Sequence, residues 1–318
     1  MAAVIVLFVI VLLMSMKFRA KKALSLFLVT VLLMGSVRGM QPSISEAAVS
    51  IETGNYKADA DKFLSRVSVH DPSVVKDPKS GMMWAPDVIW NETMQKWCMY
   101  MSINGDNWVS SICLLTADDI EGPYEYKGVV VYSGMNNPNK IVDETKTDIY
   151  KVLGEGADLS RYAFTNESCV NAIDPNIQED ENGDLYMTYG SWSAGIYQLK
   201  LDKTTGLRDY NTKYETKQDV SDAYLGTKIA GGYYCSGEGP YILKTGKYYY
   251  LFLSYANLEA MGGYQMRIYR SENISGPYVD QNGVSAIRDH NEDIKLKNHG
   301  MKIFGSYDNV EQRRYGNR

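Results

Sequence analysis

Ala172–Ile177, with the sequence Ala-Ile-Asp-Pro-Asn-Ile, sets a carboxylate directly before a proline and then continues into strand-forming residues. The same pattern occurs in Val69–Val75 and in Gly237–Ile242, and Trp84–Ile89 carries the acid and the proline in reverse order. β-Branched and aromatic residues favour strands, and proline is tolerated at the first residue of a strand. These stretches therefore predict acidic side chains at the starts of separate strands, which can converge on one site if the strands surround an axis.

Strand-like hairpins follow three of these stretches, with polar turns between their arms. Each hairpin is followed by at least one further strand-like run, and no amphipathic helix of any length is evident. The predicted strands are Val88–Trp90, Lys96–Ser102 and Ser111–Thr116; Ile173–Gln178, Leu185–Tyr189 and Gly195–Leu201; and Tyr241–Leu243, Tyr248–Tyr255 and Gln265–Arg270. Units of three to four antiparallel strands that repeat at more than about forty residues are typical of a β-propeller.

The spacing of the repeats is uneven. Asp174 and Glu238 lie 64 residues apart, and Asp87 lies 87 residues before Asp174 because a polar insertion, Asn136–Asn166, is predicted as a surface loop. Asp71 and Asp87 are only 16 residues apart, which leaves no room for a four-stranded blade. About three blades are visible, whereas propellers have roughly four to eight. We therefore expect an all-β propeller that lacks part of the first blade and the last blade.

Composition excludes several classes of protein. The 318-residue chain has a formal net charge of −5, and its basic residues are scattered, so no nucleic-acid surface is predicted. Its four cysteines show no CxxC spacing, which argues against a zinc site. Cys98 and Cys113 could face each other on neighbouring strands, but single buried thiols are expected in a domain of this size.

The N-terminus reads as a targeting segment. A basic run, Met16–Lys22, precedes an apolar stretch, Ala23–Met34, and small residues follow, which is the pattern of a secretory signal. We assign residues 1–48 to this segment, with residues 1–15 as an upstream addition before a start at Met16, and residues 49–318 to the propeller domain. The interpretation predicts a secreted protein with no stable membrane span in its mature form; a two-segment membrane hairpin is the alternative.

The motifs together resemble the endo-α-1,5-L-arabinanases of glycoside hydrolase family 43, over a stretch from His70 to about Ile287. Their order and spacing carry the resemblance, since each motif alone is weak. The motifs are His70–Pro72, Trp84–Asp87, Asn171–Asn176, Gly190–Trp192 with Gly195–Tyr197, Glu238–Ile242 and Gly276–Tyr278. The resemblance implies a five-bladed β-propeller, of which this chain would be an incomplete copy.

The resemblance also implies an inverting hydrolase with three acids. Asp71 would be the general base that activates water, Glu238 the general acid, and Asp174 the group that orients Glu238 and keeps it protonated. An inverting glycosidase holds its acid and base about 6.5–9.5 Å apart so that water fits between base and sugar. Taken singly, each acid could instead be a turn-forming residue that bonds its own backbone.

Substrate contacts are predicted at five residues. Trp192 would stack on a sugar ring, because indole offers a large flat apolar surface. Trp84 and Trp108 are further stacking candidates, while Ser191 and Asn171 could bind sugar hydroxyls. Each tryptophan could instead be a core residue, and the two polar residues could stabilise turns. Asp87 is expected to have a structural role.

The implied substrate is plant cell-wall arabinan or its oligosaccharides, acted on by a monomer. The chemistry requires no cofactor. The family resemblance allows a structural calcium ion, but its histidine ligand is not identifiable, and we assign no metal ligand. Two alternatives remain open: an inactive carbohydrate-binding remnant of such an enzyme, and a hydrolase of arabinoxylan or β-xylosides that shares the acid triad.

Overall fold

The computed structural model divides the chain into two units, Met1–Leu64 and Ser65–Arg318. The first unit, with the predicted targeting segment, lies outside the residues that the structure describes. In the second unit the structure describes residues 66–68, 75–77, 81–104, 109–136, 142–163, 170–192, 194–233, 237–256, 263–288 and 300–305. Side chains are described from residue 83 onward, without that of Asn104.

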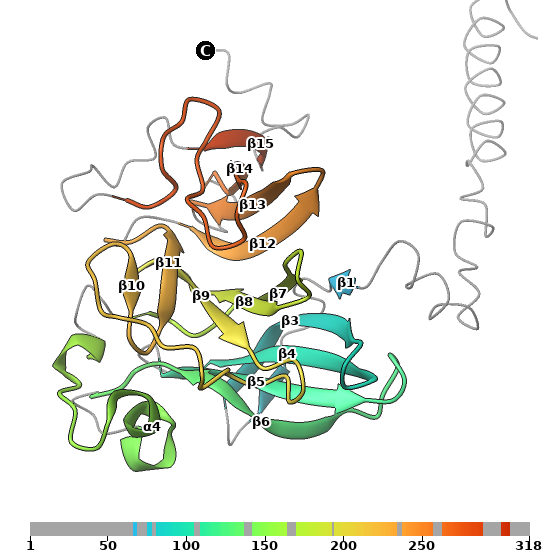
Figure 1. The fold of residues 1–318 in the computed structure, drawn as a ribbon, viewed down its shortest axis with the longest axis vertical. Helices are drawn as coiled ribbons and strands as arrows, with labels where there is room; N and C mark the ends of the chain where they lie inside the picture. The colour runs from blue at the N-terminus through green and yellow to red at the C-terminus, as the bar shows by residue number, and fades with distance from the viewer. Residues whose placement is uncertain are drawn as a thin grey trace, which may run out of the picture. The chain divides into compact units, whose positions relative to one another are not determined.

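The described residues form three antiparallel sheets that follow one another in chain order (Figure 1). The first sheet has the order β1-β3-β4-β5-β6, and β2 also pairs with β3. Its strands are β1 (Arg66–Ser68), β2 (Val75–Asp77), β3 (Gly81–Asn91), β4 (Lys96–Asn104), β5 (Ser110–Ala117) and β6 (Glu125–Tyr132). The all-β prediction is confirmed, and the first predicted hairpin corresponds to β3 and β4.

The second and third sheets repeat this meander. The second has the order β10-β11-β9-β8-β7, and the third the order β12-β13-β14-β15. Their strands are β7 (Asn176–Glu179), β8 (Leu185–Tyr189), β9 (Ile196–Leu201), β10 (Ser221–Asp222), β11 (Gly226–Ala230), β12 (Glu238–Thr245), β13 (Tyr248–Tyr255), β14 (Gln265–Ser271) and β15 (Met301–Gly305). The other two predicted hairpins are thus β7–β8 and β12–β13.

Hydrogen bonds from buried side chains connect β3, β7 and β12, one strand from each of the three sheets. Asp87 on β3 is 2% exposed, and its Oδ2 accepts hydrogen bonds from the backbone N–H of Ile177, at 2.6 Å, and from the Asn176 amide, at 3.2 Å. Asn176 on β7 repeats the arrangement one sheet further on, because its Oδ1 accepts from the N–H of Ile242 on β12, at 2.7 Å. β3, β7 and β12 therefore lie next to one another, as the inner strands of propeller blades do.

The residue before each proline in these strands has a left-handed backbone. Ala85, Asp174 and Gly239 have φ angles of 44°, 56° and 57°. The ladder register shifts at this point in β3 and β12, which identifies a bulge in each strand. The repeated Pro pattern seen in the sequence is therefore a repeated backbone shape, which lies within β3 and β12 and directly before β7.

Between Asp71 and Asp87, β2 and the first part of β3 form an antiparallel pair. β2 pairs with the first part of β3 through Val75↔Met83, and β1 pairs with its second part through Val67↔Val88. The two short strands thus share one edge of β3, at the place where the sequence predicted missing blade material. In the sequence, Asp71 comes after β1 and before β2, and it lies outside the described residues.

The insertion predicted as a surface loop packs onto the core, which corrects that expectation. It contains the 3₁₀ turns η4 (Glu144–Lys146) and η5 (Ser160–Tyr162) and the short helix α4 (Ile149–Leu153). Ile149 and Tyr162 are 0% and 5% exposed and join the hydrophobic cluster of the first two sheets. The insertion was predicted to be exposed because most of its residues are polar and only a few are apolar.

Among the described residues, no helix is both long and apolar enough to cross a membrane.

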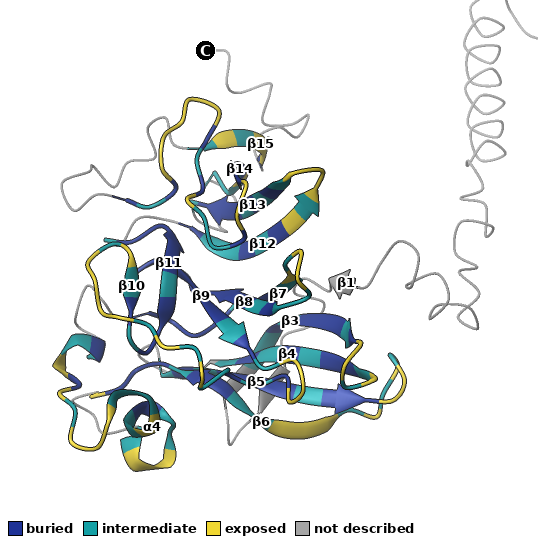
Figure 2. Cartoon of the chain, viewed as in Figure 1, coloured by how far each residue is buried: buried dark blue, intermediate teal, exposed yellow. Residues whose placement is uncertain are grey.

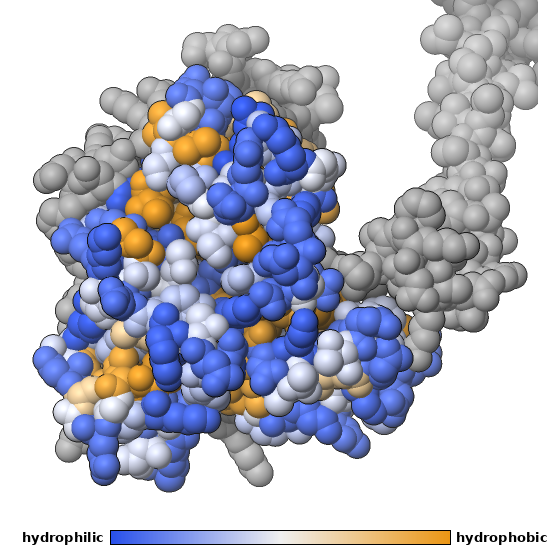
Figure 3. Space-filling model, viewed as in Figure 1, coloured by the Kyte–Doolittle hydropathy of each residue, from blue (hydrophilic) through white to orange (hydrophobic). Residues whose placement is uncertain are grey.

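Buried residues run along the middle of each sheet, while the hairpin turns are exposed (Figure 2). Tyrosine supplies much of this core: Tyr100, Tyr189, Tyr224 and Tyr255 are fully buried. Tyrosine can occupy such sites because its hydroxyl finds a polar partner, as that of Tyr100 does on the Gly206 carbonyl at 2.8 Å. On the face shown in Figure 3, apolar residues form separate patches among hydrophilic side chains.

The two cysteines whose side chains are described are free and buried. Cys98 lies opposite Thr116, and Cys113 lies opposite Met101, so they do not face each other across the β4–β5 ladder. Burial raises the pKa of the Cys98 thiol to about 12 and that of Cys113 to about 11. Both behave as small apolar core residues, as the sequence favoured.

We predict that Asp87→Ala destabilises the protein. The change leaves the buried N–H of Ile177 without its acceptor, which costs about 1–3 kcal/mol in free energy of unfolding. Urea denaturation followed by circular dichroism measures the loss. Asp118→Ala is the matched control, because Asp118 is 87% exposed and its ion pair with Lys96 is worth about 1 kcal/mol or less. Equal effects of the two substitutions would contradict the structural role of Asp87.

Candidate active site

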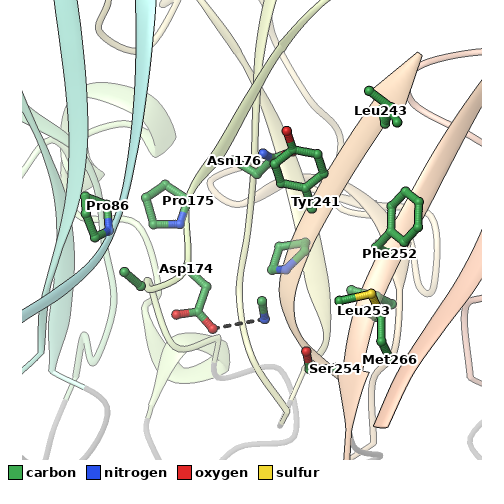
Figure 4. A pocket seen from close by; sticks show the side chains of 13 residues that line it. Pro86, Asp174, Pro175, Asn176, Tyr241, Leu243, Phe252, Leu253, Ser254 and Met266 are labelled. Atoms are coloured by element: carbon green, nitrogen blue, oxygen red, sulfur yellow. Dashed lines mark hydrogen bonds between the residues drawn. The ribbon is translucent and has the colours of Figure 1, made fainter. Parts of the chain in front are cut away.

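Asp174 is fixed between the first and third sheets by its own backbone and side chain. Its backbone N–H donates to Oγ of Ser102, a fully buried residue on β4, at 3.0 Å. Its carboxylate Oδ2 accepts the N–H of Gly239 at 3.0 Å (Figure 4). Gly239 directly follows Glu238, so the structure places two of the three predicted acids on adjoining segments.

Glu238, the first residue of β12, has a carboxylate held by three neutral donors. The Ser191 hydroxyl and the Trp192 indole N–H each donate to Oε2 at 3.1 Å. The Tyr264 hydroxyl donates to Oε1 at 2.8 Å. Three donors from two loops fix both the position and the rotation of the carboxyl group, which is what a proton donor at a defined point in space requires.

Trp192 faces Glu238 with its polar edge. Its backbone is left-handed, with φ at 44°, and its N–H donates to the carbonyl of Gly237 at 3.0 Å. A left-handed backbone is uncommon for a bulky residue and persists where the surroundings fix it. The sequence predicted this residue as a stacking surface. The structure adds a second role for its indole N–H, and stacking on a sugar stays a prediction.

Sequence reasoning missed Tyr264. It precedes β14, 26 positions after Glu238, and belongs to no motif. Burial, followed by the nearby charge of Glu238, raises the pKa of the phenol, so Tyr264 keeps its proton at neutral pH. Nothing in the local sequence distinguishes it from the other 24 tyrosines of the chain.

A pocket of about 340 Å³ opens beside Asp174. Figure 4 shows Asp174 between Pro86 and Pro175 on one side and the strands β12 and β13 on the other. The apolar lining of the pocket includes Tyr241, Leu243, Phe252, Leu253 and Met266. A largely apolar hollow with an acid at its wall suits a ligand that offers both apolar faces and hydroxyl groups.

The other predicted contact residues are spread over the described part of the chain. Asn171 is 8% exposed, and its Oδ1 accepts from the Ser110 hydroxyl at 2.7 Å. Trp84 lies on β3, paired with Ser102 across the ladder. Asp71 and Trp108 lie outside the described residues. Of the three predicted acids, the structure therefore describes Asp174 and Glu238.

The structure shows no donor set for a metal ion among the residues it describes, since none of their His, Cys, Asp and Glu side chains form a group of three or more. All three histidines fall outside these residues. The structural calcium ion stays a prediction of the family resemblance, and the reaction below uses no metal.

Comparison with protein-family models matches residues 151–307 to the glycosyl hydrolases of family 43. The extracellular endo-α-(1→5)-L-arabinanase of Thermotoga petrophila is 36% identical over 227 residues, which cover 71% of this chain and 43% of that protein. The extracellular endo-α-(1→5)-L-arabinanase 2 of Bacillus subtilis is 33% identical over 72% of this chain and 44% of its own length. This chain belongs to glycosyl hydrolase family 43.

Solved structures of family 43 agree with the fold. The endo-1,5-α-L-arabinanase of Thermotoga petrophila superposes with a TM-score of 0.54 at 35% identity, over 71% of this chain and 45% of that chain. The YxiA protein of Bacillus licheniformis gives 0.57 at 29% identity, over 76% and 61%. These neighbours are five-bladed β-propellers, so the three sheets correspond to propeller blades. The chain spans less than half the length of the two curated relatives.

We predict that Ser102→Ala destabilises the protein, because the Ser102 hydroxyl accepts the backbone N–H of Asp174. The change leaves the N–H of Asp174 without its acceptor and lowers the free energy of unfolding by about 1–3 kcal/mol. Urea titration monitored by tryptophan fluorescence measures it. Ser111→Ala on β5, a half-buried position, is the control and is expected to cost less than about 0.5 kcal/mol. A loss in Ser102→Ala no larger than in the control would contradict this anchoring role.

Proposed function

We propose that this chain hydrolyses internal α-1,5-L-arabinofuranosyl bonds of arabinan by an inverting acid/base mechanism. The observation that carries the proposal is the placement of Glu238, fixed by three donors beside Asp174, in a chain similar to endo-arabinanases. Arabinan is favoured over arabinoxylan or β-xylosides because the relatives just described are named for arabinan.

Each acid has one role in the proposed reaction. Glu238 gives its proton to the glycosidic oxygen as the bond from that oxygen to the anomeric carbon breaks. Asp71 takes a proton from water, and the oxygen of that water bonds to the anomeric carbon on the opposite face. Asp174 orients Glu238 through the amide of Gly239. Each proton transfer is worth about 10²–10⁴ in rate.

The proposed substrate lies against the apolar pocket beside Asp174. A pentofuranose ring has apolar C–H faces, which Tyr241 and Phe252 in this pocket can cover. Trp192, Ser191, Asn171, Trp84 and Trp108 remain the proposed further contacts with the sugar chain.

The proposed setting is extracellular, with arabinan or arabino-oligosaccharides as the partner of a monomeric enzyme. Both curated relatives are named as extracellular proteins, and the predicted secretory signal in residues 1–48 supports the same location for this chain.

We predict that Glu238→Gln abolishes activity on linear arabinan. Glutamine keeps the size of the side chain but has no acidic proton to give, so kcat falls by about 10²-fold or more. Reducing-sugar release from arabinan measures the loss, and urea denaturation confirms that the variant folds. Glu272→Gln is the matched control, because Glu272 is exposed and pairs with Lys247 on the surface.

Two outcomes would contradict the proposal. Retained hydrolysis in Glu238→Gln would remove the role of that residue. If the unaltered protein releases no oligosaccharide but is retarded in arabinan affinity gels, the chain is a binding protein and the hydrolase proposal is wrong.

The proposed mechanism also fixes the stereochemistry of the product. Attack by water opposite to the leaving oxygen converts an α-linkage into a β-hemiacetal. Proton NMR of a digest recorded within the first minutes, before the anomers equilibrate, is expected to show the β-anomer first. First appearance of the α-anomer would indicate a retaining reaction and would overturn the assignment of a base and an acid.

A further inference from the structure

The two oxygens of Glu238 have different partners. Oε2 receives the Trp192 indole N–H and the Ser191 hydroxyl, while Oε1 receives the Tyr264 hydroxyl. An indole N–H can only donate a hydrogen bond, whereas a hydroxyl can donate or accept. The partners of the two oxygens therefore respond differently when Glu238 gains a proton.

A proton on Oε2 conflicts with its surroundings. The carboxylic O–H would have to share that oxygen with an indole N–H that cannot turn its donor away, because Trp192 is fixed by its backbone bond to Gly237. A proton on Oε1 meets no such conflict, since the Tyr264 hydroxyl can rotate and accept it. The geometry thus favours Oε1 as the oxygen that carries the proton.

The hydroxyl of Tyr264 has a place for its own hydrogen in that state. Ser254 lies opposite Glu238 across the β12–β13 ladder, and its side chain is near enough to Tyr264 to lower the pKa of the phenol. When Tyr264 accepts from Glu238, it can donate to Ser254 Oγ. In that state the inferred order of donors runs from Glu238 through Tyr264 to Ser254, opposite to the Tyr264-to-Glu238 direction seen in the structure.

We propose that Tyr264 is a positioning residue that holds the catalytic proton on Oε1 of Glu238, with Ser254 as its partner. This inference rests on the proposed hydrolase function. In the reaction, the proton leaves Oε1 for the glycosidic oxygen as the glycosidic bond breaks. Glu238 is left as a carboxylate, and Tyr264 turns back to donate to Oε1, the arrangement seen in the structure.

The test separates proton donation from binding by changing the leaving group. Tyr264→Phe keeps the ring but removes the hydroxyl. On linear arabinan, whose sugar leaving group needs protonation, kcat is expected to fall about 10- to 100-fold with KM unchanged. On an arabino-oligosaccharide with a dinitrophenyl aglycone, which leaves without a proton, kcat is expected to change less than about 3-fold.

Two further variants make the test specific. Ser254→Ala keeps the Tyr264 hydroxyl and removes only the acceptor proposed for its hydrogen, so a smaller loss of about 3- to 10-fold is expected on arabinan, with none on the activated substrate. Tyr250→Phe, a half-buried tyrosine on β13, is the matched control and is expected to leave both rates unchanged.

Each outcome is decisive. Equal losses on both substrates, or a rise in KM alone, would show a structural or binding role for Tyr264 and overturn the inference while the hydrolase proposal stands. Full activity of Tyr264→Phe on arabinan would overturn it as well. Failure of the unaltered protein on both substrates would overturn the proposed function together with this inference.

Discussion

Side chains on β3 and β7 each accept a hydrogen bond from the backbone of the next inner strand, and the order of the three sheets depends on these two contacts. Asp87 does this for β7, and Asn176 does it for β12. Both acceptors are buried, where an unpaired N–H costs far more than it would at the surface. Apolar contacts between twisted sheets would tolerate sliding, whereas these bonds allow one register. Glu238 begins β12 and Asp174 lies two residues before β7, so the same register also brings these two acids close together.

The site uses strained backbone where the sheets meet. Asp174 and Trp192 have left-handed φ angles, which cost of order 1–3 kcal/mol each and need support from their surroundings. Asp174 receives that support from Ser102 and Gly239, and Trp192 receives it from Gly237. The left-handed backbone at each residue gives its side chain a direction that it would not have in a regular strand. The carboxylate of Asp174 reaches the third sheet, and the indole N–H of Trp192 reaches Glu238.

The sequence predicted those parts of the fold whose signals are local. Polar turns between strand-forming residues located the three hairpins, and the acid-proline pattern located Asp174 and Glu238. The pairing of β2 with β3 was not predicted, because the short spacing between Asp71 and Asp87 was interpreted as a sign of missing blade material. In the structure, Lys76 and Asp77 of β2 pair with Met82 and Gly81 of β3. Tyr264 was missed for a different reason. Its role depends on the packing of β14 against β12 through β13, and no periodicity or motif records such a contact.

Part of the pocket's apolar lining comes from a repeated position in the inner strands, the residue that follows the proline. Asp87 and Asn176 follow their prolines directly, and Tyr241 follows Pro240 at the same place in β12. Tyr241 places a large aromatic ring where the other two strands have a short polar side chain. The centroid of the Tyr241 ring lies 6.5 Å from that of Phe252, edge to face, and both residues line the pocket beside Asp174. One change of residue type in a repeated position thus adds an apolar wall to the pocket beside Asp174.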